Sequence, residues 1–261
     1  MNIKKYIPNA ITCGNLLCGC LAIIKIFEGN LILASYFVGI ALILDFFDGF
    51  SARLLNVSSN IGKDLDSLAD LVTFGVVPGV MMFKIIEIIR ILNITTGLVN
   101  SDNSSIGIDS SVYWPPYFAL VIPVFSAIRL AKFNNDTRQS DSFIGLPTPA
   151  NAIFICSLPL VFNLDYLFFE SENNFFLSNL LLNPTSLIVL SFLSSFLLIS
   201  ELPLIALKFK NFGWKDNKIK FIFIVFCVML ILCFQLKSLP LIIILYILLS
   251  IVNNIFFKKK V

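Results

Sequence analysis

Five aspartates lie within residues 45–70, the stretch DFFDGFSARLLNVSSNIGKDLDSLAD, whereas the whole 261-residue chain has only 16 acidic residues. On a helix with 3.6 residues per turn, Asp45 and Asp48 lie about 60° apart and share one face. Asp66 and Asp70 lie about 40° apart and share another, while Asp64 lies about 160° from Asp66. Four of the five acids are therefore candidates for one site, and Asp64 is expected to point elsewhere.

The elements that must position these acids are two helices joined by a short turn. If residues 31–55 and 61–90 form an antiparallel pair that turns near NVSSN at 56–60, the acids of the two helices lie at matching distances from the turn. At about 1.5 Å per residue, their depths differ by only about 1.5–3 Å. The four carboxylates can then converge between the two helices.

Four converging carboxylates suit divalent metal ions. They cannot all stay ionised in a region of low dielectric constant without cations, and two divalent ions would balance them. Ligation by carboxylates alone favours Mg²⁺ or Mn²⁺. Gly49 and Ala52 leave space on the same helix face, and Arg53 could hold phosphate oxygens. Two such metals are a known arrangement for displacement at phosphorus.

Two other interpretations of the acids remain. One is a buried ion-pair network with Arg53 and Lys63, although two bases do not balance five acids. The other is a transport pathway for divalent cations or protons, which favours inverted repeats that this sequence does not show. The chain has no histidine, so acid–base chemistry would fall to carboxylates, lysine or tyrosine.

The composition predicts an integral membrane protein. The chain is 57% hydrophobic, with a mean hydropathy of +0.91, and apolar runs of about 20 residues can cross a bilayer as helices. The expected fold is all-α, a polytopic membrane helix bundle with about eight transmembrane helices in a single domain over residues 1–261. The expected spans are 8–28, 31–55, 61–90, 113–135, 149–164, 184–207, 219–237 and 239–257.

Basic residues predict how the chain is oriented. Lys and Arg accumulate in cytoplasmic loops, and with the N-terminus inside, 15 of the 19 basic residues lie on the cytoplasmic side. The sequence therefore predicts that both termini and the turn between the acid-bearing helices face the cytoplasm, in the cytoplasmic (inner) membrane.

The acid-bearing stretch resembles the CDP-alcohol phosphatidyltransferase family. It reproduces the whole family signature D-x-x-D-G-x-x-A-R-x8-G-x-x-x-D-x-x-x-D. The matching residues are Asp45, Asp48, Gly49, Ala52, Arg53, Gly62, Asp66 and Asp70. The resemblance covers the family core at about residues 8–207, and the two C-terminal helices at 219–257 lie outside the signature.

The resemblance implies a metal-dependent transfer of a phosphatidyl group from a CDP-linked lipid to an alcohol, with release of CMP. By this resemblance, Asp45, Asp48 and Asp66 hold two divalent ions. Asp70 is expected to belong to the metal site as well, and it is the candidate base that deprotonates the acceptor hydroxyl. The expected partners are CDP-diacylglycerol, the acceptor alcohol, membrane lipids and a second copy of the chain in a homodimer, with no nucleic acid.

The resemblance also implies contacts to the nucleotide and diphosphate. They fall on Gly49, Ala52, Arg53 and Gly62, and on residues of the N-terminal segment PNAIT, namely Pro8, Asn9 and Thr12. For PNAIT the alternative is an ordinary helix start with Pro8 in the first turn.

Segments outside the signature resemble the branch of the family that uses L-serine. They are DSLADLVTFGVVPG, RLAKFN at 129–134 and GLPTPANA at 145–152. Relatives that use glycerol 3-phosphate share the aspartates, so that acceptor remains an alternative. Arg129 is the candidate for the serine carboxylate, with Lys132 one turn on as a second cation. Alternatively, both residues anchor their helix at the lipid headgroups.

Overall fold

The structure is a computed structural model, and it describes residues 6–57, 59–95, 115–135, 143–162, 183–205 and 213–256. The N-terminal half contains α1 (Tyr6–Phe27), α2 (Leu31–Leu54), α3 (Asn60–Asp70), the π-helical segment η2 (Leu71–Val76) and α4 (Val77–Thr95). The remainder contains the 3₁₀ turn η4 (Pro115–Leu120), α5 (Val121–Asn135), α6 (Thr148–Cys156), α7 (Leu158–Phe162), α9 (Pro184–Ile199), α10 (Trp214–Phe234), the 3₁₀ turn η5 (Gln235–Ser238) and α11 (Leu239–Phe256).

The all-α prediction is confirmed. The described residues form only one pair of very short strands, in which β1 (Phe143–Ile144) runs antiparallel to β2 (Pro203–Leu204). This pair joins the segment before α6 to the segment after α9, so it ties loops together and does not form a layer of the fold.

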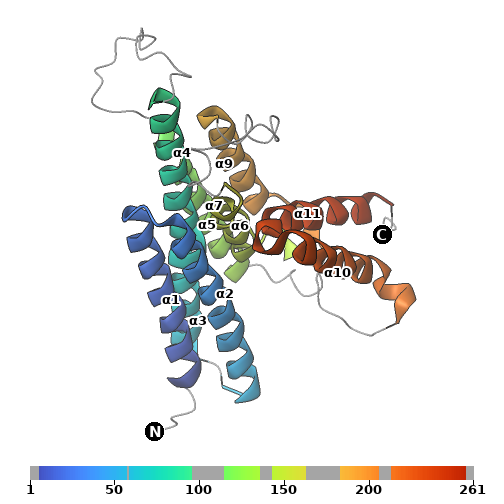
Figure 1. Cartoon of the computed structure of the whole chain (residues 1–261). Coiled ribbons are helices and arrows are strands. Elements are labelled where there is room, and N and C mark those ends of the chain that lie inside the picture. The colour runs from blue at the N-terminus through green and yellow to red at the C-terminus, as the bar shows by residue number, and fades with distance from the viewer. Residues whose placement is uncertain are drawn as a thin grey trace.

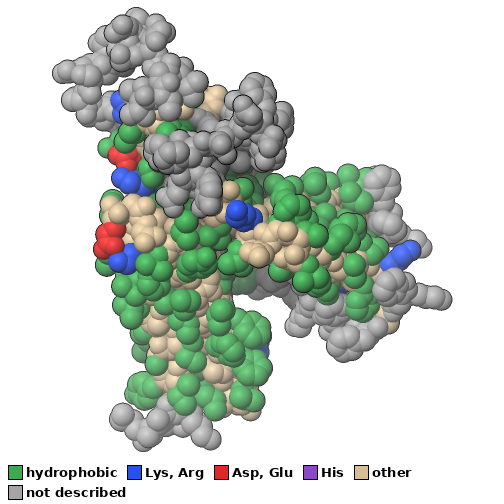
Figure 2. Space-filling view, viewed as in Figure 1, with side chains coloured by type: hydrophobic (Ala, Val, Ile, Leu, Met, Phe, Trp, Pro, Cys, Tyr) green, Lys and Arg blue, Asp and Glu red, His purple; other side chains and the backbone are tan. Residues whose placement is uncertain are grey.

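The helices are those of a multi-pass membrane protein. Among the described residues, five helical stretches are long and apolar enough to cross a bilayer: Tyr6–Phe27, Leu31–Leu54, Asn60–Asn93, Pro115–Asn135 and Asn217–Ile255. Two shorter apolar helices cover Thr148–Val161 and Pro184–Ile199. Hydrophobic side chains cover most of the visible face of both the main bundle and the C-terminal helices (Figure 2), as expected for a surface that faces lipid. The number of eight crossings and the side of the termini remain predictions.

The third stretch is the central helix of the bundle. It runs from α3 through η2 into α4, and its buried side chains include Phe74, Met81, Met82 and Ile86. Around it stand α1, α2, α5, α6 and α9 (Figure 1). Several of the buried residues on α1 and α2 are small, including Ala22, Ala34 and Ala41, and small residues let membrane helices approach closely.

The C-terminal helices α10 and α11 lie side by side and project sideways from the main bundle (Figure 1). Polar contacts from α11 attach them to the bundle. The Tyr246 hydroxyl donates to the Ile205 carbonyl at 3.0 Å, and the Ile205 N–H donates to Ser250 Oγ at 3.2 Å. Because Ile205 directly follows β2, α11 is anchored to the two-stranded ladder.

Candidate active site

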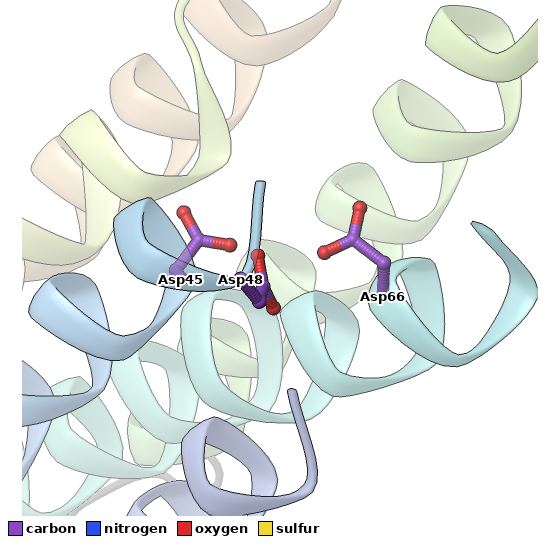
Figure 3. A group of neighbouring side chains, drawn as sticks. All are labelled: Asp45, Asp48 and Asp66. Carbon is purple, nitrogen blue, oxygen red and sulfur yellow. The ribbon is translucent and has the colours of Figure 1, made fainter. Parts of the chain in front are cut away.

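Three of the four candidate acids meet between α2 and α3. Asp45 and Asp48 come from α2 and Asp66 comes from α3, and their carboxylates point toward the space between the two helices (Figure 3). One carboxylate oxygen from each residue lies within 4.8 Å of the other two. The convergence that helix periodicity predicts for these three acids is therefore present in the fold.

Asp48 is held by a side chain from a third helix. The Thr12 hydroxyl, on α1, donates to Asp48 Oδ2 at 2.7 Å. Asp48 is only 6% exposed, and a hydrogen bond to a buried carboxylate is among the stronger ones in proteins. Because α1 packs against both α2 and α3, Thr12 is placed to fix one acid of the cluster.

Asp70 is the last residue of α3. It follows Asp66 by four residues, so the two acids share a face of α3. It is not one of the three acids whose oxygens lie within 4.8 Å of each other, and its Oδ1 is buried without a hydrogen-bond partner among the described residues. Asp64, which was expected to point elsewhere, is exposed. Asp70 thus lies outside the group of three acids whose oxygens converge, and its part in the metal site stays a prediction.

A pocket of about 170 Å³ opens beside the acids. It is lined by Pro8, Asn9, Thr12, Asp48, Gly49, Ala52, Val57, Ser59, Gly62, Lys63 and Asp66. Six of the seven residues predicted to contact the nucleotide and diphosphate are in this lining. The seventh, Arg53, is exposed and does not line the pocket, so its contact with the diphosphate stays a prediction.

The two signature glycines in the lining have different physical roles. At Gly62 an added Cβ would lie 3.0 Å from both Asn9 Oδ1 and Ser59 Oγ, and Ser59 Oγ accepts a hydrogen bond from the Gly62 N–H at 3.0 Å as the N-cap of α3. At Gly49 an added Cβ would meet no described atom within 4 Å. Gly62 therefore allows α1 and the start of α3 to approach, whereas Gly49 leaves its backbone open to whatever fills the pocket.

The structure adds three lining residues that were not assigned to the site from the sequence. Val57 and Ser59 belong to the turn between α2 and α3, and Lys63 lies in the first turn of α3. From its charge alone, Lys63 is a possible ion-pair partner for the acids. The sequence does indicate a place for Lys63 in the pocket, because it directly follows Gly62 of the family signature. Both residues line the pocket.

Arg129 and Lys132 lie outside this pocket lining. Arg129, on α5, is only 7% exposed, and its guanidinium lies 5.1 Å from the centre of the Phe133 ring. It is close enough to Asp70 to interact with it electrostatically. Lys132 is exposed. The two predicted cations therefore occupy different environments, and only Arg129 is buried beside a candidate acid.

The donor atoms fit a hard divalent cation. Asp45, Asp48 and Asp66 offer only carboxylate oxygens, the ligands that Mg²⁺ and Mn²⁺ prefer. Thr12 also orients Asp48, as hydrogen-bond partners of metal-binding carboxylates commonly do.

The sequence was compared with known families. The model of the CDP-alcohol phosphatidyltransferase family matches residues 5–182. The chain belongs to this family. The match includes the three converging acids and every residue of the pocket lining, and it ends before α9, α10 and α11.

Individual relatives of this CDP-alcohol phosphatidyltransferase carry a more specific name. A Bacillus subtilis protein named CDP-diacylglycerol–serine O-phosphatidyltransferase is 34% identical over 162 residues, covering 60% of this chain and 77% of the relative. Two Helicobacter pylori proteins have the same name. One is 36% identical over 167 residues, covering 63% of this chain and 61% of the relative. The other is 30% identical over 257 residues, covering 97% of this chain and 93% of the relative, so that alignment includes α10 and reaches into α11.

Proposed function

We propose that the protein is a phosphatidylserine synthase, which transfers the phosphatidyl group of CDP-diacylglycerol to the hydroxyl of L-serine and releases CMP. The observation that carries the proposal is the convergence of Asp45, Asp48 and Asp66 beside a pocket lined by the small residues of the family signature. The names of the relatives support serine as the acceptor.

The pocket is the proposed site for the nucleotide end of CDP-diacylglycerol. Gly49 and Ala52 leave room along α2, and the Asn9 amide offers hydrogen bonds from α1. Lys63 is a cation in the same lining and can pair with a diphosphate oxygen. The acyl chains would extend into the surrounding lipid, along the hydrophobic surface of the bundle.

Asp45, Asp48 and Asp66 are proposed to hold two divalent ions, Mg²⁺ or Mn²⁺, with Asp70 alongside them. Bound ions of this kind neutralise a diphosphate and stabilise the charge that develops during displacement at phosphorus. The role of the protein is to hold the metal-binding carboxylates in fixed positions. Thr12 holds Asp48 in place through its 2.7 Å hydrogen bond.

Asp70 is proposed as the base. Its carboxylate accepts the proton of the serine hydroxyl, the serine oxygen forms a bond to the phosphorus on the lipid side of the diphosphate, and the bond from that phosphorus to the CMP oxygen breaks. Arg129 is proposed to bind the serine carboxylate, with two parallel hydrogen bonds from its guanidinium. The support for this pairing is the burial of Arg129 close to Asp70. Lys132 is a weaker candidate because it is exposed.

We further propose that the whole chain is one integral domain of the cytoplasmic membrane, with the active site facing the cytoplasm, and that it forms a homodimer. The orientation is supported by the distribution of basic residues. The single domain is supported by the alignment with a Helicobacter pylori relative over 97% of the chain.

The test is an assay of purified protein with CDP-diacylglycerol, Mg²⁺ or Mn²⁺, and a panel of alcohols that includes L-serine and glycerol 3-phosphate. We expect serine to give CMP and phosphatidylserine in equal amounts, with loss of both products in EDTA and recovery on addition of metal. Asp45→Asn should be inactive. Asp64→Asn is the matched control, because Asp64 is an exposed acid outside the cluster, and it should remain active.

Other outcomes of this assay would replace the proposal. Release of CMP with glycerol 3-phosphate and not with serine would assign the other acceptor. Uptake of divalent metal into proteoliposomes without any release of CMP would favour a transporter.

A further inference from the structure

The helix α5 packs antiparallel to the central helix in a register that three separate contacts define. An added Cβ at Gly79 would lie 2.6 Å from Pro123 Cδ, and one at Gly75 would lie 3.0 Å from Ser126 Cβ. Nearer the active site, Asn134 Nδ2 donates to Ser67 Oγ at 2.9 Å. As the residue number rises along α5 from Pro123 to Asn134, the number of the contacting residue on the central helix falls from Gly79 to Ser67.

This register places Arg129 within two residues of Ala131, the position on α5 that lies opposite Asp70. Arg129 follows Ser126 by three residues, so the two share a face of α5. Asp70 lies between Ser67 and Gly75, whose partners on α5 lie on either side of Arg129. The electrostatic interaction between Arg129 and Asp70 agrees with this placement. No ion pair between the two residues is present among the described residues.

The π-helical segment η2 makes this alignment possible. In an α-helix, residues five apart lie about 140° from each other around the axis. The i to i+5 hydrogen bonds of a π-helix bring such residues to nearly the same side. Because η2 begins directly after Asp70 and contains Gly75, the acid and the glycine can both be directed toward α5.

Buried polar atoms with no partner collect at this same contact. They are Asp70 Oδ1, Ser126 Oγ and Arg129 Nε, none of which has a hydrogen-bond partner among the described residues. Ser126 is 0% exposed. Buried polar atoms are nearly always hydrogen-bonded, and exceptions call for an explanation. A small polar ligand held between α5 and the central helix would supply partners for Asp70 Oδ1 and Arg129 Nε, while the role of Ser126 is its close packing against Gly75.

We propose that Gly75 and Ser126 are positioning residues for the acceptor. Their close contact sets the distance and register between η2 and α5, and thereby holds the Arg129 guanidinium near the Asp70 carboxylate. This inference rests on the proposed function, because it assigns the acceptor side of the same site.

The experiment compares Gly75→Ala with Gly39→Ala in the full-length protein. Both changes add one methyl group to a membrane helix, but an added Cβ at Gly39 meets no described atom within 4 Å, which makes it the matched control. We expect Gly75→Ala to raise the KM for serine by about tenfold or more and to change the KM for CDP-diacylglycerol by less than about twofold. Gly39→Ala should leave both values unchanged. The double variant Gly75→Ala/Ser126→Gly, which removes the opposing Cβ, should restore the serine KM to within about threefold of the original value.

A second measurement reports the helix packing without any catalysis. Cysteines introduced as Ser67→Cys and Asn134→Cys, at residues whose side chains are hydrogen-bonded, are joined by a short bifunctional thiol reagent, and the linked peptides are measured by mass spectrometry. We expect Gly75→Ala to lower the yield of the cross-link and the added Ser126→Gly to restore it.

Three results would overturn the inference: an unchanged serine KM in Gly75→Ala, an equal rise in the KM of both substrates, or an unchanged cross-link yield. Failure of the proposed function is separate from these outcomes. It would appear as the absence of serine-dependent CMP release in the unmodified protein, whatever the cross-link yield of the variants.

Discussion

Replacement of Thr12 by valine tests how the acid cluster is held together. Valine keeps the shape of threonine and removes the hydroxyl that donates to Asp48 Oδ2 at 2.7 Å. A hydrogen bond to a charged group contributes about 1.5–3 kcal/mol, and each 1.4 kcal/mol corresponds to about tenfold in an equilibrium constant. If that energy orients Asp48 toward a bound metal, its loss weakens metal binding by about 10- to 100-fold, the range found for other residues that orient metal ligands.

The measurement is the rate of CMP release as the concentration of Mg²⁺ or Mn²⁺ is raised at saturating CDP-diacylglycerol and serine. We expect the metal concentration for half-maximal rate to rise about 10- to 100-fold in Thr12→Val. Thr12→Ser keeps the hydroxyl and should stay within about threefold of the original value.

The same hydroxyl also lies 3.0 Å from the Pro8 carbonyl, and this second contact gives a clear way to refute the reasoning. A threonine hydroxyl has one proton to donate. If that proton serves the Pro8 carbonyl and not Asp48, Thr12→Val will show the original metal dependence. That result would remove Thr12 from the metal site and leave it as part of the pocket wall.

Three further predictions concern the base, the acceptor and the orientation. Asp70→Asn should lower kcat by about 10²- to 10⁴-fold while both substrates still bind, because the amide keeps the shape of the side chain but cannot act as the base. A variant that keeps a tenth or more of the original rate would require another base. Arg129→Lys should raise the KM for serine by about tenfold with little change in the KM for CDP-diacylglycerol, because lysine cannot make two parallel hydrogen bonds to a carboxylate. If Arg129 only anchors its helix at the lipid headgroups, lysine should leave both KM values unchanged. Cysteines introduced in the predicted loops 93–111 and 165–179, of which 96–111 and 165–179 lie outside the described residues, should react with an impermeant reagent from the extracytoplasmic face, and Asn56→Cys should not. Labelling of Asn56→Cys from that face would place the active site on the opposite side of the membrane.

The meeting of the acids could be predicted from the sequence because it depends on helix geometry alone. The rise and rotation per residue are set by the backbone, so counting from the turn gives both the depth and the facing of Asp45, Asp48 and Asp66. The fold class is predictable for a similar reason, because a bilayer accepts few backbone arrangements. The predicted range 149–164 shows the limit of this approach. Its helical residues form two helices, α6 and α7, with a break at Ser157.

The side chains that surround the acids were harder to predict because they depend on how a third helix packs. Periodicity put Arg53 near the acids, but α2 ends at Leu54 and the turn that follows contains Asn56 in a left-handed conformation, with φ of 51°. The path of this turn decides which base lies beside the pocket, and that base is Lys63. Likewise, the bond from Thr12 to Asp48 exists because α1 packs across both acid-bearing helices, a relation that no spacing within α1 reveals.

The position of the proposed acceptor-binding residue Arg129 is harder still to predict from the sequence. Arg129 could be chosen as a candidate from its charge and its side of the membrane, but its position near Asp70 depends on the register of α5 against the central helix. That register is fixed by residues with little chemistry of their own, among them Gly75, Ser126 and Gly79, and by one helical segment with an unusual hydrogen-bond pattern. If the acceptor is held there, relatives that use a different alcohol can differ at these small residues while keeping every acid, because the acids act on the diphosphate that all of them share.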